Sequence, residues 1–393
     1  MEGDSCFPFS DLSVLYSQYC VESVFDHDFD GLFNSFSDML LKIHENRDMI
    51  DTCVIHSGRA EVTSIPIKGT SRYVLVWDQA YWEFYKSFVR TFCSLWNVFL
   101  DNTLSEEDKN ARYFRINGFF TNTIINYLIH RFPADDDFCA YMEKCRVDSK
   151  FSQLFLTVFY EDESENLLWI GKEFLLMHEL EHVLYKYSPE VFAWDSQSFN
   201  EIIDWYHDTL LPLIDDSIIP NGPDEFKEAV EWIQKNKNSN YYVELFNDFH
   251  SFFEVLDYHR ENYHDTNKPF TSKSQSFLFG VKLLKMFDSC KTFLTRSVEK
   301  ALSTKYYPKK KRCEQVKKVC RECQSSVYRR DYLAVELMFA RLLLHAERFP
   351  GFNMQSFSKL HDTMSFTSPY SNFLQPLLNE LTTHIVNTII EVF

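Results

Sequence analysis

The residues best suited to chemistry are His178, Glu179 and His182, which form an H-E-x-x-H pattern within a helical stretch. On an α-helix, residues four apart lie one turn above each other on one face, so both histidines can present a ring nitrogen to one ion. Glu179 is rotated by about 100° from His178, which places its carboxylate beside the ion, where it can accept a proton from a bound water. The pattern predicts a Zn2+ site with His178 and His182 as ligands and Glu179 as the catalytic base.

The helix that carries this pattern is apolar nearly all round, which is typical of a buried helix. Two histidines and a glutamate in such a helix need partners. The alternative to a metal site is that both histidines are hydrogen-bonded core residues and that the glutamate pairs with a basic group. Glu181 adds a second carboxylate, which could face solvent or meet an arginine.

A catalytic zinc needs a third protein ligand, which leaves the fourth position to water. A later predicted helix offers Glu244 and Asp248, one turn apart. His250, Glu254 and Asp257 lie on the same predicted helix and are rival ligands.

H-E-x-x-H followed by E-x-x-x-D on a later helix resembles the thermolysin-type (gluzincin) metallopeptidases. The resemblance covers about residues 150 to 265. It implies that Glu244 is the third ligand, that Asp248 holds a ligand histidine in orientation, and that the chain hydrolyses peptide bonds of a protein or peptide substrate. Glu181 departs from the family pattern, in which the residue before the second histidine is usually small or uncharged.

An oxyanion-stabilising residue is also expected, and the spacing does not select among Tyr258, His259 and His264. In motif, size class and predicted location the chain is also similar to the phage-exclusion Lit-type peptidases, which cut a host protein on infection. That resemblance implies a role in phage defence or as a toxin. The alternative class is a non-enzymatic helical interaction protein in which the motif is accidental or binds zinc structurally.

The composition of the 393 residues favours helix, because only 9 are Gly and 12 are Pro while 45% are hydrophobic. The formal charge of -17 argues against a general nucleic-acid or anionic-membrane binder. No apolar run of membrane-spanning length and no signal-peptide start is present, so we expect a cytoplasmic protein without membrane contact.

Hydrophobic periodicity predicts a mainly α fold with a small β-sheet around a zincin-like core. Short strands are expected at 62–67 and 73–77, separated by a turn at 68–71, and a further strand at 151–160. Helices are expected at 26–45, 78–100, 104–131, from 133 onward, 165–187, 197–215, 223–236, 239–263, 271–302, 312–348 and 372–391, with a loop at 212–223. We predict an N-terminal helical region with short strands (1–150), the catalytic core (151–265) and a C-terminal helical region (266–393), packed as one globular unit.

A basic segment at residues 305–330 holds ten Lys or Arg against two Glu. It predicts a solvated helix face first, and recruitment of an acidic protein partner or of a nucleic acid is the alternative, with nucleic acid the less expected of the two. Cys313, Cys320 and Cys323 lie in the same segment. They could hold a structural zinc only if Cys290 or a distant histidine supplied a fourth ligand, so reduced thiols are the default.

Overall fold

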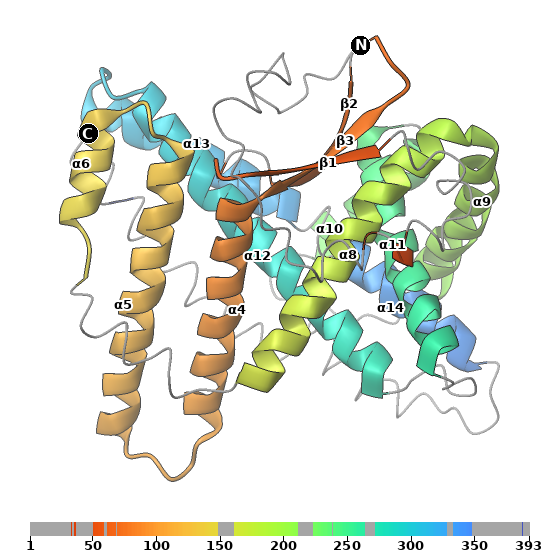
Figure 1. Cartoon of the computed structure of the whole chain (residues 1–393), viewed down its shortest axis with the longest axis horizontal. Coiled ribbons are helices and arrows are strands. Elements are labelled where there is room, and N and C mark those ends of the chain that lie inside the picture. The colour runs from red at the N-terminus through yellow and green to blue at the C-terminus, as the bar shows by residue number, and fades with distance from the viewer. Residues whose placement is uncertain are drawn as a thin grey trace. The chain divides into compact units, whose positions relative to one another are not determined.

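A computed structural model describes residues 33, 35–36, 50–58, 61–67, 69–147, 161–210, 223–237, 239–263, 272–327, 333–347 and 387 (Figure 1). These residues form ten α-helices and one three-stranded sheet, which confirms the predicted mainly helical fold with a small sheet. The chain divides into two compact units, Met1–Pro189 and Glu190–Phe393, and each is described by itself. The domain boundaries at 150 and 265 stay predictions.

The sheet of the first unit contains β1 (Ile50–Ile55), β2 (Val62–Pro66) and β3 (Tyr73–Asp78), in the order β1-β3-β2. β3 is central and buried at all of its positions, as its run of apolar residues suggests. β2 and β3 form an antiparallel hairpin whose turn includes Gly69 at a φ of 80°. The strands predicted at 62–67 and 73–77 are confirmed, whereas β1, which pairs parallel to β3, was not predicted.

Three helices follow the sheet: α4 (Gln79–Leu100), α5 (Glu106–Arg131) and α6 (Asp136–Lys144). The buried carboxylate of Asp78 caps α4 by accepting from the amide of Ala80, and it also accepts from the Ser57 hydroxyl at 2.7 Å. The Ser105 side chain caps α5 in the same way. These caps explain why α4 and α5 begin within two residues of the predicted positions.

The motif helix α8 (Glu161–Tyr187) is held along its length by contacts with α4 and the sheet. Near its start, Glu165 pairs with Arg90 of α4 at 3.2 Å. One and a half turns later, Gly171 lies so close to Tyr85 that a Cβ there would be 2.7 Å from the tyrosine ring. Near its end, Tyr187 packs edge-on against Tyr73 of β3, with ring centroids 5.6 Å apart. α8 therefore runs antiparallel to α4 and then reaches the sheet.

The second unit contains seven helical segments. They are α9 (Pro189–Trp205), which starts at the unit boundary, the π-helix η2 (Tyr206–Leu210), α10 (Pro223–Lys235), α11 (Asn240–Tyr263), α12 (Ser272–Ser303), α13 (Lys309–Val327) and α14 (Leu333–Glu347). α14 contacts α10, α11, α12 and η2, and its residues 333–340 are all buried. It is the core helix of this unit.

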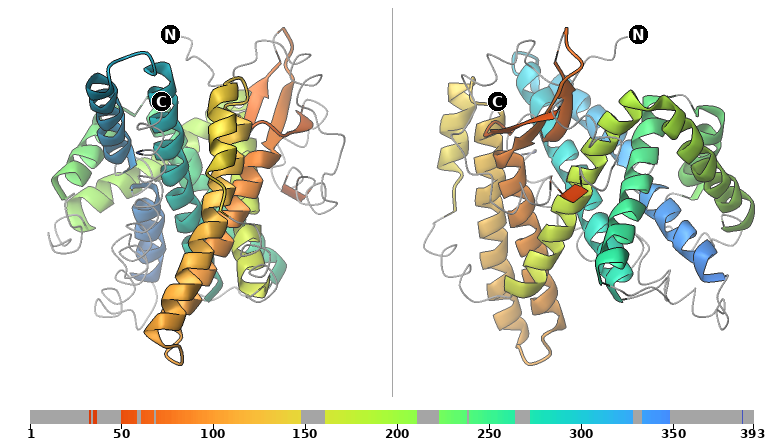
Figure 2. Two further views of the ribbon diagram at one scale, coloured as in Figure 1. Left: turned by 90° about the vertical axis from the view of Figure 1, so that its left-hand side faces the viewer. Right: turned by 45° about the vertical axis from the view of Figure 1, so that its right-hand side comes forward.

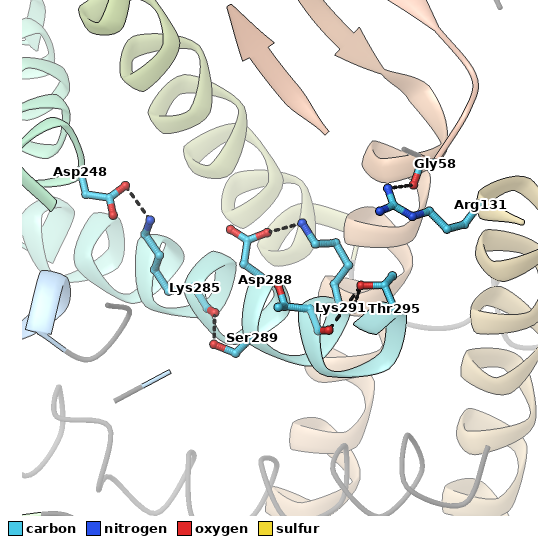
Figure 3. Close-up of polar contacts among 9 residues, drawn as sticks. Gly58, Arg131, Asp248, Lys285, Asp288, Ser289, Lys291 and Thr295 are labelled. Atoms are coloured by element: carbon cyan, nitrogen blue, oxygen red, sulfur yellow. Dashed lines mark hydrogen bonds and ion pairs between the residues drawn. The ribbon is translucent and has the colours of Figure 1, made fainter. Parts of the chain in front are cut away.

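The long helix α12 carries three buried lysines, Lys282, Lys285 and Lys291. The ammonium of Lys285 lies 2.6 Å from the carboxylate of Asp248 on α11, and Lys291 pairs with Asp288 on its own helix (Figure 3). Lys282 has Glu336 of α14 as its acidic neighbour. The core of the second unit is therefore partly ionic.

Two helix predictions need correction. The helix expected at 197–215 begins at Pro189 and gives way to the π-helix at Tyr206. The fixed φ of proline suits the first position of a helix, so Ser188-Pro189 both ends α8 and starts α9. The single helix expected at 312–348 is described as two helices, α13 and α14, and residues 328–332 between them lie outside the described residues.

The predicted strand at 151–160 and loop at 212–222 lie outside the described residues. So do the predicted helices at 26–45 and 372–391, apart from Phe33, Ser35, Phe36 and residue 387, which are helical. Within the described part of the chain, none of the helices combines the length and apolarity that crossing a membrane requires.

Candidate metal centre

The candidate centre lies in the second half of α8, where His178 and His182 approach each other one turn apart. Their Nε2 atoms are 3.2 Å apart and their ring planes are inclined by 77°. Two nitrogens bound to one zinc at 2.0–2.1 Å with a tetrahedral angle would be about 3.3 Å apart. The two histidines therefore present their nitrogens at the separation that one tetrahedral zinc requires.

Glu179 completes the group. One ligand atom from each of His178, Glu179 and His182 lies within 4.8 Å of the others. Among the residues that the structure describes, no other set of three or more His, Cys, Asp or Glu side chains comes together in this way. His178 and Glu179 are buried and His182 is partly exposed, so the group has one side open to solvent.

The Glu179 carboxylate is fixed by the sheet. The backbone N–H of Ser64 in β2 donates to its Oε2 at 2.6 Å. Residues 61 and 67 form backbone hydrogen bonds with the β3 side of the hairpin, so by alternation the Ser64 N–H points to the open side of β2. The amide at the edge of the sheet thus orients the carboxylate beside the two histidines.

Glu181 is fully buried, with 0% of its surface exposed. The sequence left open whether this carboxylate faces solvent, and the structure excludes that orientation. Burying a carboxylate is costly unless other groups compensate. On the helix, Glu181 flanks the histidine pair on the side opposite to Glu179.

The predicted ligand Glu244 and its partner Asp248 lie on α11 in the second unit. Asp248 is fully buried and forms the ion pair with Lys285 described above. The roles of Glu244 as third ligand and of Asp248 as an orienting acceptor stay predictions.

The rival ligands on α11 have acidic or basic neighbours within the second unit. His250 lies 3.7 Å from the carboxylates of both Asp195 and Glu254. Asp257 and Glu254 act on the guanidinium of Arg341, whose pKa is nevertheless lowered by burial. Each rival residue therefore has at least one charged neighbour within the second unit.

The other residues singled out from the sequence are only partly described. Tyr258 and His259 lie on α11 with their rings in edge-on contact, and His264 is outside the described residues. Cys313, Cys320 and Cys323 lie on α13, and the side chains of the last two are not described. The Ser64 amide is the one group at the centre that the sequence did not suggest, because a backbone N–H carries no residue-type signal.

Comparison with known proteins gives no family for this chain: no family model, no curated protein and no solved structure matches it. The geometry of α8 and β2 therefore carries the functional argument.

Proposed function

We propose that this chain is a zinc-dependent metallopeptidase centred on α8. The observation that supports it best is the 3.2 Å separation of the His178 and His182 Nε2 atoms, beside a carboxylate. A hydrogen bond between the two rings would also give this distance, but it would not explain why the Glu179 carboxylate is held beside them. Helix spacing, metal geometry and the position of Glu179 all agree with a catalytic zinc site.

In this proposal His178 and His182 hold the ion through Nε2, and Glu244 is the predicted third ligand. A bound zinc would lower the pKa of its water toward about 7 and polarise the substrate carbonyl. Glu179 accepts the proton of the attacking water and delivers it to the leaving amine. The Ser64 amide keeps the Glu179 carboxylate in the orientation that this transfer needs.

The substrate class is a protein or peptide, and the resemblance to Lit-type peptidases supports a role in phage defence or as a toxin. This part of the proposal rests on the resemblance alone. A cytoplasmic location belongs to the same proposal.

The test combines metal analysis with a substrate-independent assay. Wild-type protein should contain about one zinc per chain. The His178→Ala variant should lose the metal, whereas Glu179→Gln should retain it. Glu173→Gln is the matched control, because it makes the same change at another buried carboxylate of α8, which accepts from the Trp169 indole.

Activity is measured by labelling new protein N-termini in a cell lysate incubated with each variant. Wild type and the Glu173→Gln control should generate the same set of new termini, and His178→Ala and Glu179→Gln should generate none. A wild-type protein that stays metal-free after expression with added zinc would overturn the proposal. A zinc-loaded protein that forms no new termini in any lysate would instead favour the non-enzymatic alternative, with a structural metal.

A further inference from the structure

A basic and aromatic surface lies at the junction of α12 and α13, which pack side by side and are joined by residues 304–308 (Figure 2). Residues 305–322 hold eight Lys or Arg against two Glu, a net charge of +6 in a protein whose total is -17. We call the exposed side of this segment the α13 basic face. It includes Tyr306, Tyr307, Lys310, Lys311, Lys317, Lys318 and Arg321, all of them exposed. The same side also carries the exposed carboxylates of Glu314 and Glu322, and that of Glu322 lies 3.9 Å from the Lys318 ammonium.

The cations of this face are ordered by the helix. α13 turns Arg312 and Val316 inward, where both are buried. Lys310, Glu314, Lys317 and Arg321 follow one another at spacings of four, three and four residues, so they form one stripe on the outer side, about 16 Å long at 1.5 Å per residue, with three cations and one exposed carboxylate. A stripe of this length with a net positive charge can contact several phosphates of an extended strand.

The first turn of α13 places charge against the helix dipole. Lys309, Lys310 and Lys311 occupy that turn, and no acidic residue accompanies them. The positive end of the dipole lies at the helix N-terminus, so cations there reduce helix stability. Sequence preferences such as acidic residues in the first turn are violated mainly at functional sites. In α13 the violation gives the helix a strongly positive N-terminal end.

Two tyrosines stand beside these cations. The Tyr306 side chain is 89% exposed and Tyr307 is 46% exposed. The Lys311 ammonium lies 4.4 Å from the centre of the Tyr307 ring, and Lys305 lies 5.6 Å from that of Tyr306. A large ring at 89% exposure contributes almost nothing to the folded core, and its faces are accessible to a ligand.

We propose that the α13 basic face binds single-stranded nucleic acid. Cations would neutralise the backbone phosphates, and the open Tyr306 ring would stack on an unpaired base, which is the combination that single-strand binding surfaces use. An acidic polypeptide, the partner expected from the sequence, would use the cations and leave the aromatic ring without a role. The exposure of Tyr306 is the observation that favours nucleic acid.

The test measures fluorescence anisotropy of labelled probes with the full-length protein over a range of salt concentrations. The probes are an RNA and a DNA single strand of about 15 nucleotides, the DNA duplex of the same sequence, and polyglutamate. At least one single strand should bind more tightly than the duplex. With up to five cations contacting phosphates, the logarithm of the association constant should fall with the logarithm of salt with a slope of up to about -3.5.

Two variants separate the two components of the surface. Lys310→Glu/Lys317→Glu/Arg321→Glu should weaken single-strand binding at least about 10-fold and flatten the salt dependence. Tyr306→Ala should weaken it about 10-fold without changing the salt dependence, whereas Tyr306→Phe should bind like wild type. Arg115→Glu/Lys144→Glu/Lys235→Glu is the matched control, since it makes the same charge change at three exposed cations elsewhere.

Several results would overturn the proposal. The first is binding of polyglutamate in preference to both single strands. The second is a loss of single-strand affinity in the control triple variant as large as that in the Lys310, Lys317 and Arg321 triple variant. The third is unchanged single-strand binding by Tyr306→Ala. The Glu179→Gln variant should bind the probes like wild type. A lack of nucleic-acid binding would therefore not contradict the proposed peptidase site. A lack of peptidase activity would likewise not contradict nucleic-acid binding by the α13 basic face.

Discussion

Lys282 should be a residue whose removal stabilises the protein. Its side chain is buried in the second unit, and this desolvation lowers the pKa of its ammonium to about 7, even though nearby Glu336 acts to raise it. Glu336 also accepts from the Tyr206 hydroxyl at 3.4 Å, so it retains a polar partner when the lysine is replaced. Lys282→Met, which keeps an unbranched side chain one heavy atom shorter, removes a group that is costly to keep charged.

The size of the effect follows from the pKa. Lowering it from 10.5 to about 7 means that the surroundings favour the neutral amine by about 5 kcal/mol. Between these two pH values the unfolded chain binds a proton that the folded chain does not, so wild-type stability rises with pH. Lys282→Met should therefore raise the free energy of unfolding by about 4 kcal/mol at pH 7 and by less than about 1 kcal/mol at pH 10.

The assay is urea unfolding monitored by hydrogen exchange of α12 peptides, so that the measured free energy of unfolding refers to the second unit. Lys285→Met is the matched control three residues away. It breaks the buried pair with Asp248 and should destabilise by about 3–5 kcal/mol. A Lys282→Met variant that folds but is less stable than wild type at pH 7, or whose advantage does not change with pH, would refute the reasoning.

Two further substitutions test the first unit. Gly171→Ala places a Cβ within 2.7 Å of Tyr85 and should lower stability by about 1–3 kcal/mol in a thermal melt. Gly118→Ala is the control, because its Cβ meets only the Val147 side chain at 3.2 Å and the substitution should be close to neutral. Equal losses of stability in the two variants would argue against the close packing of α8 on α4. Asp78→Ala removes the cap of α4 and the partner of Ser57 and should cost about 2–4 kcal/mol by urea unfolding, with a smaller loss in Asp78→Asn. A loss below about 0.5 kcal/mol in Asp78→Ala would contradict that role.

The sequence predicted those parts of the fold that depend on local patterns. The alternating residues of β2 and the apolar run of β3 identified two strands, and the acidic first turn of α5 located its start. β1 escaped prediction because Asp51 and Thr52 interrupt its apolar pattern and because its parallel partner lies more than 20 residues away.

The candidate centre was likewise predictable from the sequence only where it depends on local patterns. Helix geometry was sufficient to bring His178 and His182 together and to place Glu179 beside them. The contact between Glu179 and the Ser64 amide joins positions 115 residues apart and involves a backbone group, so no residue pattern could have revealed it. The burial of Glu181 likewise depends on what covers α8, which a single helix sequence does not contain.

The contact between Glu179 and Ser64 also bears on self-association. Among the described residues β2 pairs only with β3, so its outer side carries backbone groups that this sheet leaves unpaired, and such groups can recruit a strand from another chain. The outward positions are Val62, Ser64 and Pro66; proline has no N–H, and the Ser64 N–H is already bound by Glu179. The carboxylate therefore blocks one of the two amides at which an aggregating strand could begin to pair. A Glu179→Ala variant would free that amide, which is a practical reason to use glutamine, whose side-chain oxygen can still accept from it.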